Sequence, residues 1–260
     1  MRNKLTKETI LKLIEMELKE QESTGFDIKD LCCYFSKEDG KNMVLYHGPK
    51  LLEAFQFLFS FEADIVNKEE VAKQLIQNAG VVGFIALDSP RPGGKCMGSY
   101  EVMLSAVHPK YQGQKIGKLL YMLTMMEVYP APLMSDRNDV SEKARWVWHS
   151  MNKNNEIEKT PSEEDGYMGE FDDIKDPETS PEDDDCKLQD DIYLNRGYIY
   201  KGSGQNQKIK SLLTLNHKKY IKSTIGANDN EDRTYLTQQW IESAINEATD
   251  KLFYLAYQGS

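Results

Sequence analysis

Apolar residues recur at helical spacing near the beginning of the chain. Within residues 6–21 they occur every three or four positions, and charged residues lie between them. This spacing puts the apolar side chains on one face of a helix, for which Thr6 is a favourable N-cap. Residues 68–77 repeat the pattern. We therefore expect residues 1–78 to form a mostly helical region that packs on the rest of the protein.

The pattern changes to short apolar runs after residue 80. Residues 81–87 are apolar, and prolines and glycines break any regular structure over residues 88–94. Residues 96–107 return to an extended pattern that ends before Pro109, because the residue before a proline is pushed out of the helical region. This order predicts two neighbouring antiparallel strands joined by a loop.

Helices and strands alternate in the remainder of the chain. The spacing of apolar residues, together with nearby prolines and glycines, sets the expected boundaries. The expected elements are helices at residues 116–127, 140–152, 208–222 and 237–257 and strands at residues 132–135 and 192–200. We therefore expect an α/β protein of the α+β type, with a mixed, mostly antiparallel central sheet flanked by helices.

The negative charge of the chain is concentrated in one segment. The net charge is −10, and residues 156–191 hold sixteen Asp or Glu against three Lys, a net charge of −13 that leaves +3 for the rest. Large aliphatic residues are scarce there, so the segment cannot bury enough apolar surface to offset the entropy of ordering. We expect residues 154–190 to be a mobile acidic insertion, either a flap that guides a cationic substrate or a solvated linker.

Composition excludes several classes of protein. The four cysteines and four histidines are scattered without the spacing of a disulfide framework or a metal site, so we expect neither. The sequence has no apolar run of about 18 residues and no secretory signal at its beginning. We therefore expect a cytoplasmic protein that does not enter membranes, and the negative net charge argues against direct binding of nucleic acid.

One strand-to-helix turn carries most of the chemical information. Residues 102–120 predict a strand that ends in a turn and opens directly into a helix. Free main-chain N–H groups and the helix dipole at such a helix start favour a phosphate group. The turn reads Gln112-Gly-Gln-Lys-Ile-Gly117 and follows Val107 and Pro109. The sequence therefore predicts a site for a pyrophosphate.

This turn resembles the coenzyme A loop of the GNAT superfamily of N-acetyltransferases, whose pattern is Arg/Gln-x-x-Gly-x-Gly/Ala after a strand ending in Val-x-Pro. Lys115 stands where the family usually has glycine. Downstream, Ser141-x-x-Ala144-x-x-Val147-Trp148 resembles the family's Asn-x-x-Ala-x-x-Leu/Phe-Tyr helix, with Trp148 in place of the tyrosine. The acidic insertion and Ser135-Asp136-Arg137 resemble GNAT-like proteins encoded by tailed bacteriophages, which would place the protein in the host cytoplasm.

The resemblance implies acetyl transfer from acetyl-coenzyme A, as cosubstrate, to an amine. It implies Glu101 as the general base. Many family members use the tyrosine at the position of Trp148 as a general acid, which an indole cannot replace. Tyr198, preferred over Tyr200, is then the candidate hydroxyl. The implied cofactor-binding residues are Leu104, Ser105, Ala106, Val107, Gln112, Gly113, Gln114, Lys115, Ile116, Gly117 and Lys118.

The resemblance also sets the expected domain organisation. Residues 79–153 would form the acetyl-coenzyme A binding core, and residues 191–260 a completing strand and the C-terminal helices. The acceptor stays open among a protein lysine, a protein N-terminus and a small amine. Lys115 and Trp148 motivate the alternative, a catalytically weak or inactive interaction protein on the same scaffold that binds a host protein.

Overall fold

The computed structural model describes most of the chain between residues 28 and 257. The described ranges are residues 28–36, 41–60, 67–88, 98–136, 140–159, 192–194, 196–226 and 237–257. The expected helix at residues 6–21, the loop within residues 89–97 and the acidic stretch 160–190 lie outside them. No helix within the described ranges is long and apolar enough to cross a lipid bilayer.

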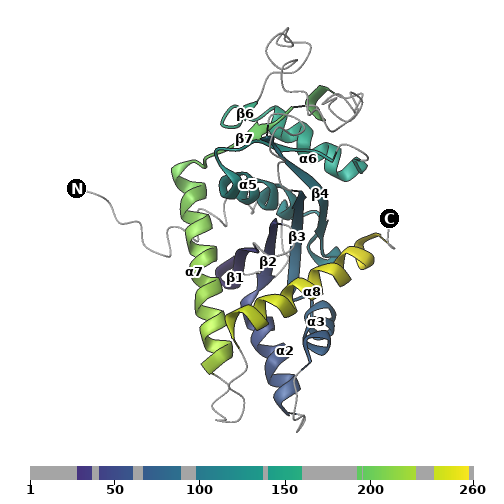
Figure 1. Cartoon of the computed structure of the whole chain (residues 1–260), viewed down its shortest axis with the longest axis vertical. Coiled ribbons are helices and arrows are strands. Elements are labelled where there is room, and N and C mark those ends of the chain that lie inside the picture. Colours follow the sequence, from purple (N-terminus) through teal and green to yellow (C-terminus); the bar gives the residue numbers. More distant parts are fainter. Residues whose placement is uncertain are drawn as a thin grey trace, which may run out of the picture.

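Strands and helices are interspersed along the described chain, and the last two elements are long helices (Figure 1). The strands are β1 (Leu31–Ser36), β2 (Lys41–His47), β3 (Val81–Asp88), β4 (Tyr100–Val107), β5 (Leu133–Met134), β6 (Glu158–Lys159) and β7 (Tyr198–Ile199). The α-helices are α2 (Gly48–Ser60), α3 (Lys68–Gln77), α5 (Ile116–Val128), α6 (Glu142–Asn152), α7 (Gly204–Gly226) and α8 (Gln238–Tyr257). Short 3-10 helices are η1 (Ile28–Asp30), η2 (Pro109–Tyr111) and η4 (Ile192–Leu194).

The seven strands form one sheet in the order β1-β2-β3-β4-β5-β7-β6. All neighbours run antiparallel except β4 and β5, which are parallel. A parallel pair needs a crossover connection, and α5 supplies it between β4 and β5. The expected mixed, mostly antiparallel sheet flanked by helices is therefore confirmed.

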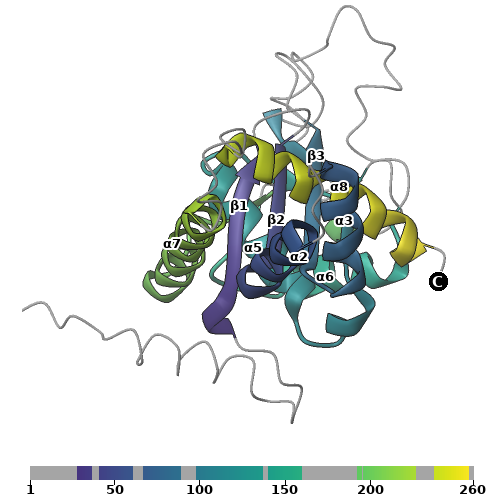
Figure 2. The same cartoon turned by 90° about the horizontal axis from the view of Figure 1, so that it is seen from below.

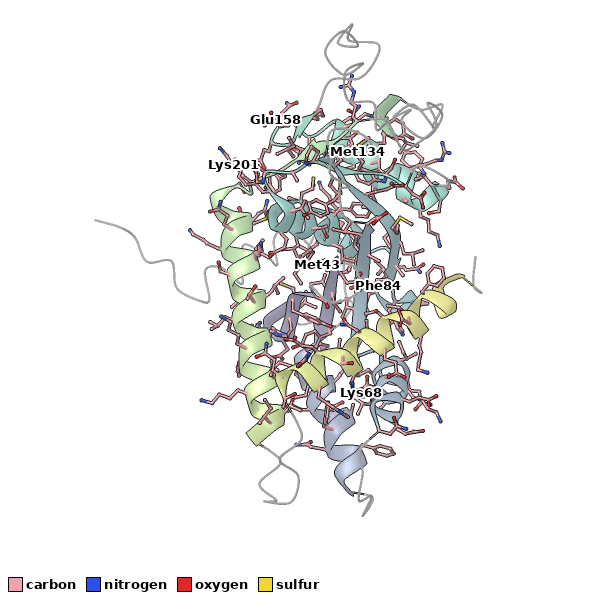
Figure 3. The ribbon with its side chains drawn as sticks, viewed as in Figure 1. Met43, Lys68, Phe84, Met134, Glu158 and Lys201 are labelled. Atoms are coloured by element: carbon pink, nitrogen blue, oxygen red, sulfur yellow. The ribbon has the colours of Figure 1, made fainter. Side chains whose placement is uncertain are left out.

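Helices cover both faces of the sheet. One core cluster joins α5, α6 and β7 to one face, and a second joins α2, α3 and α8 to the other. Met43 of β2 belongs to the first cluster and Phe84 of β3 to the second, and both are labelled in Figure 3. The long helix α7 lies beside β1 at the edge of the sheet, as Figure 2 shows from below, and contributes side chains to both clusters.

The expectation that residues 1–78 are mostly helical needs correction at residues 31–47, which form β1 and β2. Leu31 and Cys33 of β1 belong to one core cluster, and Cys32 and Tyr34 belong to the other. A strand buried on both faces shows a continuous apolar run in place of the period-two alternation that identifies a strand in a sequence. The helices α2 and α3 agree with the expectation.

The start of the expected acidic insertion also needs correction. Glu158 and Lys159 of β6 pair with Ile199 and Tyr198 of β7, so residues 154–159 lead into the sheet. Figure 3 shows Glu158 at the same end of the molecule as Lys201, which follows β7. The sheet thus continues on both sides of the acidic stretch, and the mobility of residues 160–190 stays a prediction.

Gly48, at the start of α2, has no room for a side chain. A Cβ atom there would lie 2.1 Å from Cδ2 of Tyr220, a buried residue of α7. We expect Gly48→Ala to lower the free energy of unfolding by about 1–3 kcal/mol, because the ring or the helix must shift. Gly204→Ala, at the first residue of α7, meets no atom within 4 Å and is the control. Equal denaturation midpoints for the two variants would contradict this packing of α7.

Candidate functional site

The two-residue strand β5 pairs only with the beginning of β4. The parallel register ends at the pair Glu101–Met134, whereas β4 continues to Val107. Beyond that pair, no strand in the described part of the chain pairs with the outer edge of β4. Met103 and Leu104 are 41% and 38% exposed. The end of β5 therefore leaves main-chain groups of β4 open to an extended ligand.

A β-bulge lies in the open part of β4. Two consecutive residues of β3 face Leu104 and Val102, so Met103 is an extra residue of β4. An extra residue reverses the alternation of side chains between the two faces. Ser105 therefore lies on the α5 face, and Glu101 lies on the opposite face. Regular strand alternation would place Glu101, Met103 and Ser105 on one face, and the bulge removes that relation.

Hydrogen bonds between side chains and the main chain stabilise the turn after β4. The main-chain N–H of His108 donates to the carbonyl of Val82 at 2.9 Å, and its Nδ1 accepts from the N–H of Lys110 at 3.2 Å. The Nε2 atoms of Gln112 and Gln114 donate to the carbonyls of Val107 and Lys110, each at 3.2 Å. These two glutamines, expected to contact the cofactor, thus hold the shape of the turn with their side-chain amides.

Lys115 ends the turn in a left-handed conformation. Its φ and ψ angles are 58° and 11°, and Gly113 two residues earlier also has a positive φ of 80°. The carbonyl of Lys115 accepts the N–H of Leu119 at 3.1 Å at the start of α5. A left-handed residue with a side chain costs about 1–2 kcal/mol, so glycine would be the less strained residue at this position.

The electrostatic surroundings of the turn favour an anion. The stretch from Val102 to Met126 contains no Asp or Glu, although the whole chain is acidic. It contains Lys110, Lys115 and Lys118, which lie in the turn and the first turn of α5. The helix start adds its own partial positive charge and its N–H groups. The expected pyrophosphate site therefore has the charge and the donors that such a group needs.

The neighbouring helix α2 supports the turn from the side. The Nζ atom of Lys50 donates to the hydroxyl of Tyr111 at 3.0 Å and to the carbonyl of Ala79 at 3.2 Å. The Tyr111 hydroxyl donates to the same carbonyl at 2.8 Å. Partial burial lowers the pKa of Lys50. These contacts fix the ring of Tyr111, which is buried at the base of the turn.

A hydroxyl pair lies under the open part of β4. The Tyr121 hydroxyl of α5 and Oγ of Ser105 are 3.1 Å apart. Burial raises the pKa of Tyr121 to about 12, although the hydrogen bond with Ser105 lowers it. The phenol therefore stays protonated near neutral pH and can act as a hydrogen-bond donor. The sequence reasoning missed Tyr121, which lies four residues after Gly117 and hence on the same helix face as the end of the turn.

The expected acid Tyr198 lies in the core. Its hydroxyl donates to the carbonyl of Tyr193 at 2.6 Å, and burial raises its pKa. The ring of Trp148 lies between those of Tyr198 and Tyr121, at centroid distances of 5.3 and 5.0 Å. The hydroxyl of the alternative Tyr200 is bonded to residues at the start of α7. Both candidate hydroxyls thus already form hydrogen bonds within the protein.

The expected cofactor-binding residues lie along one continuous track. It runs from residues 104–107 of β4 through the turn at 112–115 to residues 116–118 at the start of α5. Glu101 lies where the pairing of β4 with β5 ends, and its side chain is on the opposite face of the sheet from Ser105. Among the described residues, no three His, Cys, Asp or Glu side chains gather as metal ligands would. No protein family, curated protein or solved structure matches the chain.

Lys115 offers a direct test of the geometry of the turn. We expect Lys115→Gly to raise the free energy of unfolding by up to about 1 kcal/mol, because relief of the left-handed strain exceeds the added entropy of the unfolded chain. Lys115→Ala removes the same charge but keeps a Cβ atom, and it should leave stability nearly unchanged. Urea denaturation measures both variants. A glycine variant no more stable than the alanine variant would contradict the left-handed geometry.

Proposed function

We propose that this protein is a GNAT-type N-acetyltransferase that transfers acetyl from acetyl-coenzyme A to an amine. The observation that carries the proposal is the outer edge of β4 beyond Glu101, which pairs with no described strand and leads to a turn that opens into the N-terminus of α5. The open strand edge suits an extended pantetheine, and the adjoining helix start suits a pyrophosphate. One ligand that contains both groups in sequence is coenzyme A.

The proposed binding mode uses main-chain groups more than side chains. The pyrophosphate would accept hydrogen bonds from N–H groups between Gly113 and Lys118, with the surrounding lysines adding positive charge. The pantetheine would lie along residues 104–107 of β4. The thioester would then reach the point where the pairing of β4 with β5 ends, near Glu101 and Ser105. Such positioning supplies much of the catalysis expected for acyl transfer.

The proposed reaction places the base and the leaving group on opposite faces of β4. The amine nitrogen forms a bond with the carbonyl carbon, its proton passes to Glu101, and the carbon–sulfur bond breaks. The departing thiolate accepts a hydrogen bond from the Ser105 hydroxyl, which Tyr121 orients from below. Because the pKa of Tyr121 is near 12, we assign it hydrogen bonding and not proton transfer. The acceptor would approach from the face of α3 and α8.

A second candidate function is that of an interaction protein that has this fold but does not catalyse acetyl transfer. The buried ring of Trp148 motivates it, because a packed indole occupies the position at which many GNAT proteins have a tyrosine. In that case the bound partner would be a protein, and coenzyme A would bind weakly or not at all. Measured acetyl transfer separates the two candidates.

Acetyl-coenzyme A should stabilise the protein against heat. A ligand present at about 100 times its dissociation constant stabilises the native state by about 2.7 kcal/mol. We expect Gly117→Asp to abolish the shift in melting temperature, since a carboxylate in the first turn of α5 repels the pyrophosphate. Gly117→Ala is the control, because a Cβ atom there meets only Val147 at 3.9 Å. An unchanged shift in the aspartate variant would show that coenzyme A binds elsewhere.

The role of the hydroxyl pair can be separated from binding. We expect Tyr121→Phe to lower kcat about 10-fold to 100-fold with little change in the KM for acetyl-coenzyme A, because Ser105 loses the hydrogen bond that orients its hydroxyl toward the departing sulfur. Ser105→Ala should have a similar effect, and the double variant should lose little more. Tyr129→Phe is the control, since that ring is exposed. If the factors by which kcat falls in the two single variants multiply in the double variant, the two hydroxyls act independently, and the shared role is refuted.

A further inference from the structure

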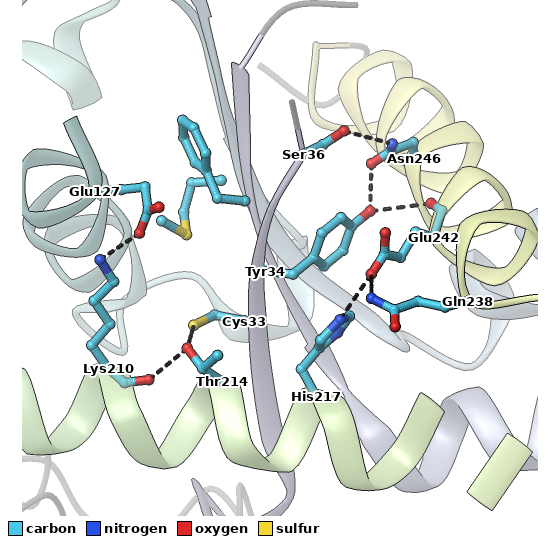
Figure 4. Close-up of a pocket in the computed structure, with 12 residues that line it drawn as sticks. Cys33, Tyr34, Ser36, Glu127, Lys210, Thr214, His217, Gln238, Glu242 and Asn246 are labelled. Carbon is cyan, nitrogen blue, oxygen red and sulfur yellow. Dashed lines mark hydrogen bonds and ion pairs between the residues drawn. The ribbon is translucent and has the colours of Figure 1, made fainter. Parts of the chain in front are cut away.

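A pocket lies at one end of the sheet, around the outer edge of β1. Its volume is about 410 Å³, and residues of β1, α5, α7 and α8 form its walls. Figure 4 shows Glu127 of α5 and Glu242 of α8 on opposite sides of β1, with α7 running below both. Glu127 is eleven residues after the start of α5, roughly 16 Å along the helix axis from the turn at Lys115. The pocket is therefore separate from the proposed acetyl-transfer site.

The pocket exists because α7 covers only part of the edge of β1. The Nδ2 atom of Asn216 donates to the carbonyls of Lys29 and Leu31, both at 2.9 Å. These bonds occupy the main chain at the beginning of the strand. Residues 33–36, farther along, line the pocket. An edge strand that opens into a cavity of this volume is typical of a small-molecule site and not of closed packing.

Glu242 presents an anchored carboxylate to the pocket. Its Oε1 atom accepts hydrogen bonds from Nε2 of His217 at 3.0 Å and from Nε2 of Gln238 at 2.7 Å. Burial raises the pKa of this carboxyl, but these two hydrogen bonds outweigh it and hold the pKa below its usual range. The side chain is 26% exposed. Within the described residues, no partner is recorded for its second oxygen, Oε2.

A chain of hydrogen bonds fixes this orientation. Nε2 of His217 donates to the carboxylate, and Nδ1 lies 3.0 Å from the hydroxyl of Tyr46, with which it shares a hydrogen bond. The ring of Tyr34 stacks on the imidazole at 5.1 Å, with an angle of 22° between the planes. Tyr46 and His217 are both buried. The carboxylate is thus held toward the cavity by groups that are themselves packed in the core.

The carboxylates of the lining favour a cation. On the other side of β1, the ammonium group of Lys210 forms an ion pair with Glu127. The lining therefore holds two carboxylates against one ammonium group and the imidazole of His217. Phe35 and Met43 add apolar surface on the same side of β1 as Glu127 and Lys210. An anionic ligand would be repelled by the Oε2 atom of Glu242, whereas a cation would pair with it.

The same groups are poorly suited to covalent chemistry. Burial raises the pKa of the Cys33 thiol to about 11, so little thiolate exists near neutral pH. Both ring nitrogens of His217 already have hydrogen-bond partners, which leaves no free base beside a nucleophile. The pocket therefore fits recognition of a ligand better than its conversion.

We propose that this pocket binds a small organic cation that carries an amine or guanidinium group. The cationic group pairs with Oε2 of Glu242, and the aliphatic part of the ligand passes around the edge of β1 toward Phe35 and Met43 on the other side. Acetyl transfer is not needed for this binding, because the pocket shares no residue with the proposed acetyl-coenzyme A track.

Agmatine, which carries a guanidinium and an amine on a four-carbon chain, is a suitable probe. We expect calorimetry of the full chain to give a dissociation constant below about 1 mM. Glu242→Gln keeps the size of the side chain but removes its charge, and it should weaken binding at least tenfold. Glu127→Gln frees the charge of Lys210 and should also weaken binding. Glu247→Gln, on the same helix outside the pocket, is the control and should change affinity less than twofold.

Three results would overturn the proposal. One is the absence of agmatine binding to the unaltered protein. Another is equal affinity in the Glu242→Gln variant, provided that its circular dichroism shows a folded chain. If that variant does not fold, unchanged binding in Glu127→Gln has the same meaning. Equal binding of butylurea, which is neutral and similar in shape, would show that the pocket recognises a polar group and not a cation.

Discussion

The pairing of β4 with β5, which joins the two halves of the sheet, consists of two residue pairs. The proposed site depends on the shortness of this pairing, because it leaves the remaining outer edge of β4 without a strand partner among the described residues. On one side lie the four antiparallel strands β1 to β4, and on the other lie β5, β7 and β6. The pairing stops at Glu101, so the remaining length of β4 has no partner on that side among the described strands. Helix α5 packs against strands of both halves. The unpaired length of β4 thus lies beside a helix that joins the two halves through the core.

The turn that leads from this length of β4 into α5 is rigid before any ligand binds. The side chains of Gln112 and Gln114 are bonded to main-chain carbonyls, and Tyr111 is fixed by contacts with the loop before β3. Lys115 holds a left-handed conformation that costs about 1–2 kcal/mol, and it adds a positive charge at the proposed pyrophosphate site. A preorganised turn loses less entropy on binding, which offsets part of that strain.

The sequence pattern predicted well the elements that have strong local signals. Residues 116–128 and 142–152 form helices close to the expected bounds, because their apolar residues have helical spacing and prolines or an N-cap mark the ends. The pattern did not predict β1, because a strand buried on both faces lacks the alternation of apolar and polar residues. It also did not predict the bulge at Met103, because a bulge leaves no mark in the order of apolar residues. Tyr121 beside Ser105, and His217 beside Glu242, meet only after folding, so spacing along the chain could not reveal them.

Hydrogen–deuterium exchange with and without acetyl-coenzyme A tests the central claim most directly. If the cosubstrate binds along the outer edge of β4 and the turn before α5, its pyrophosphate accepts hydrogen bonds from the main-chain N–H groups of the turn. Amides in residues 112–119 should then exchange at least tenfold more slowly in its presence. Amides of β1 and the first turns of α8 should be unaffected. Unchanged exchange in residues 112–119 at a saturating concentration, or protection confined to β1 and α8, would contradict the account.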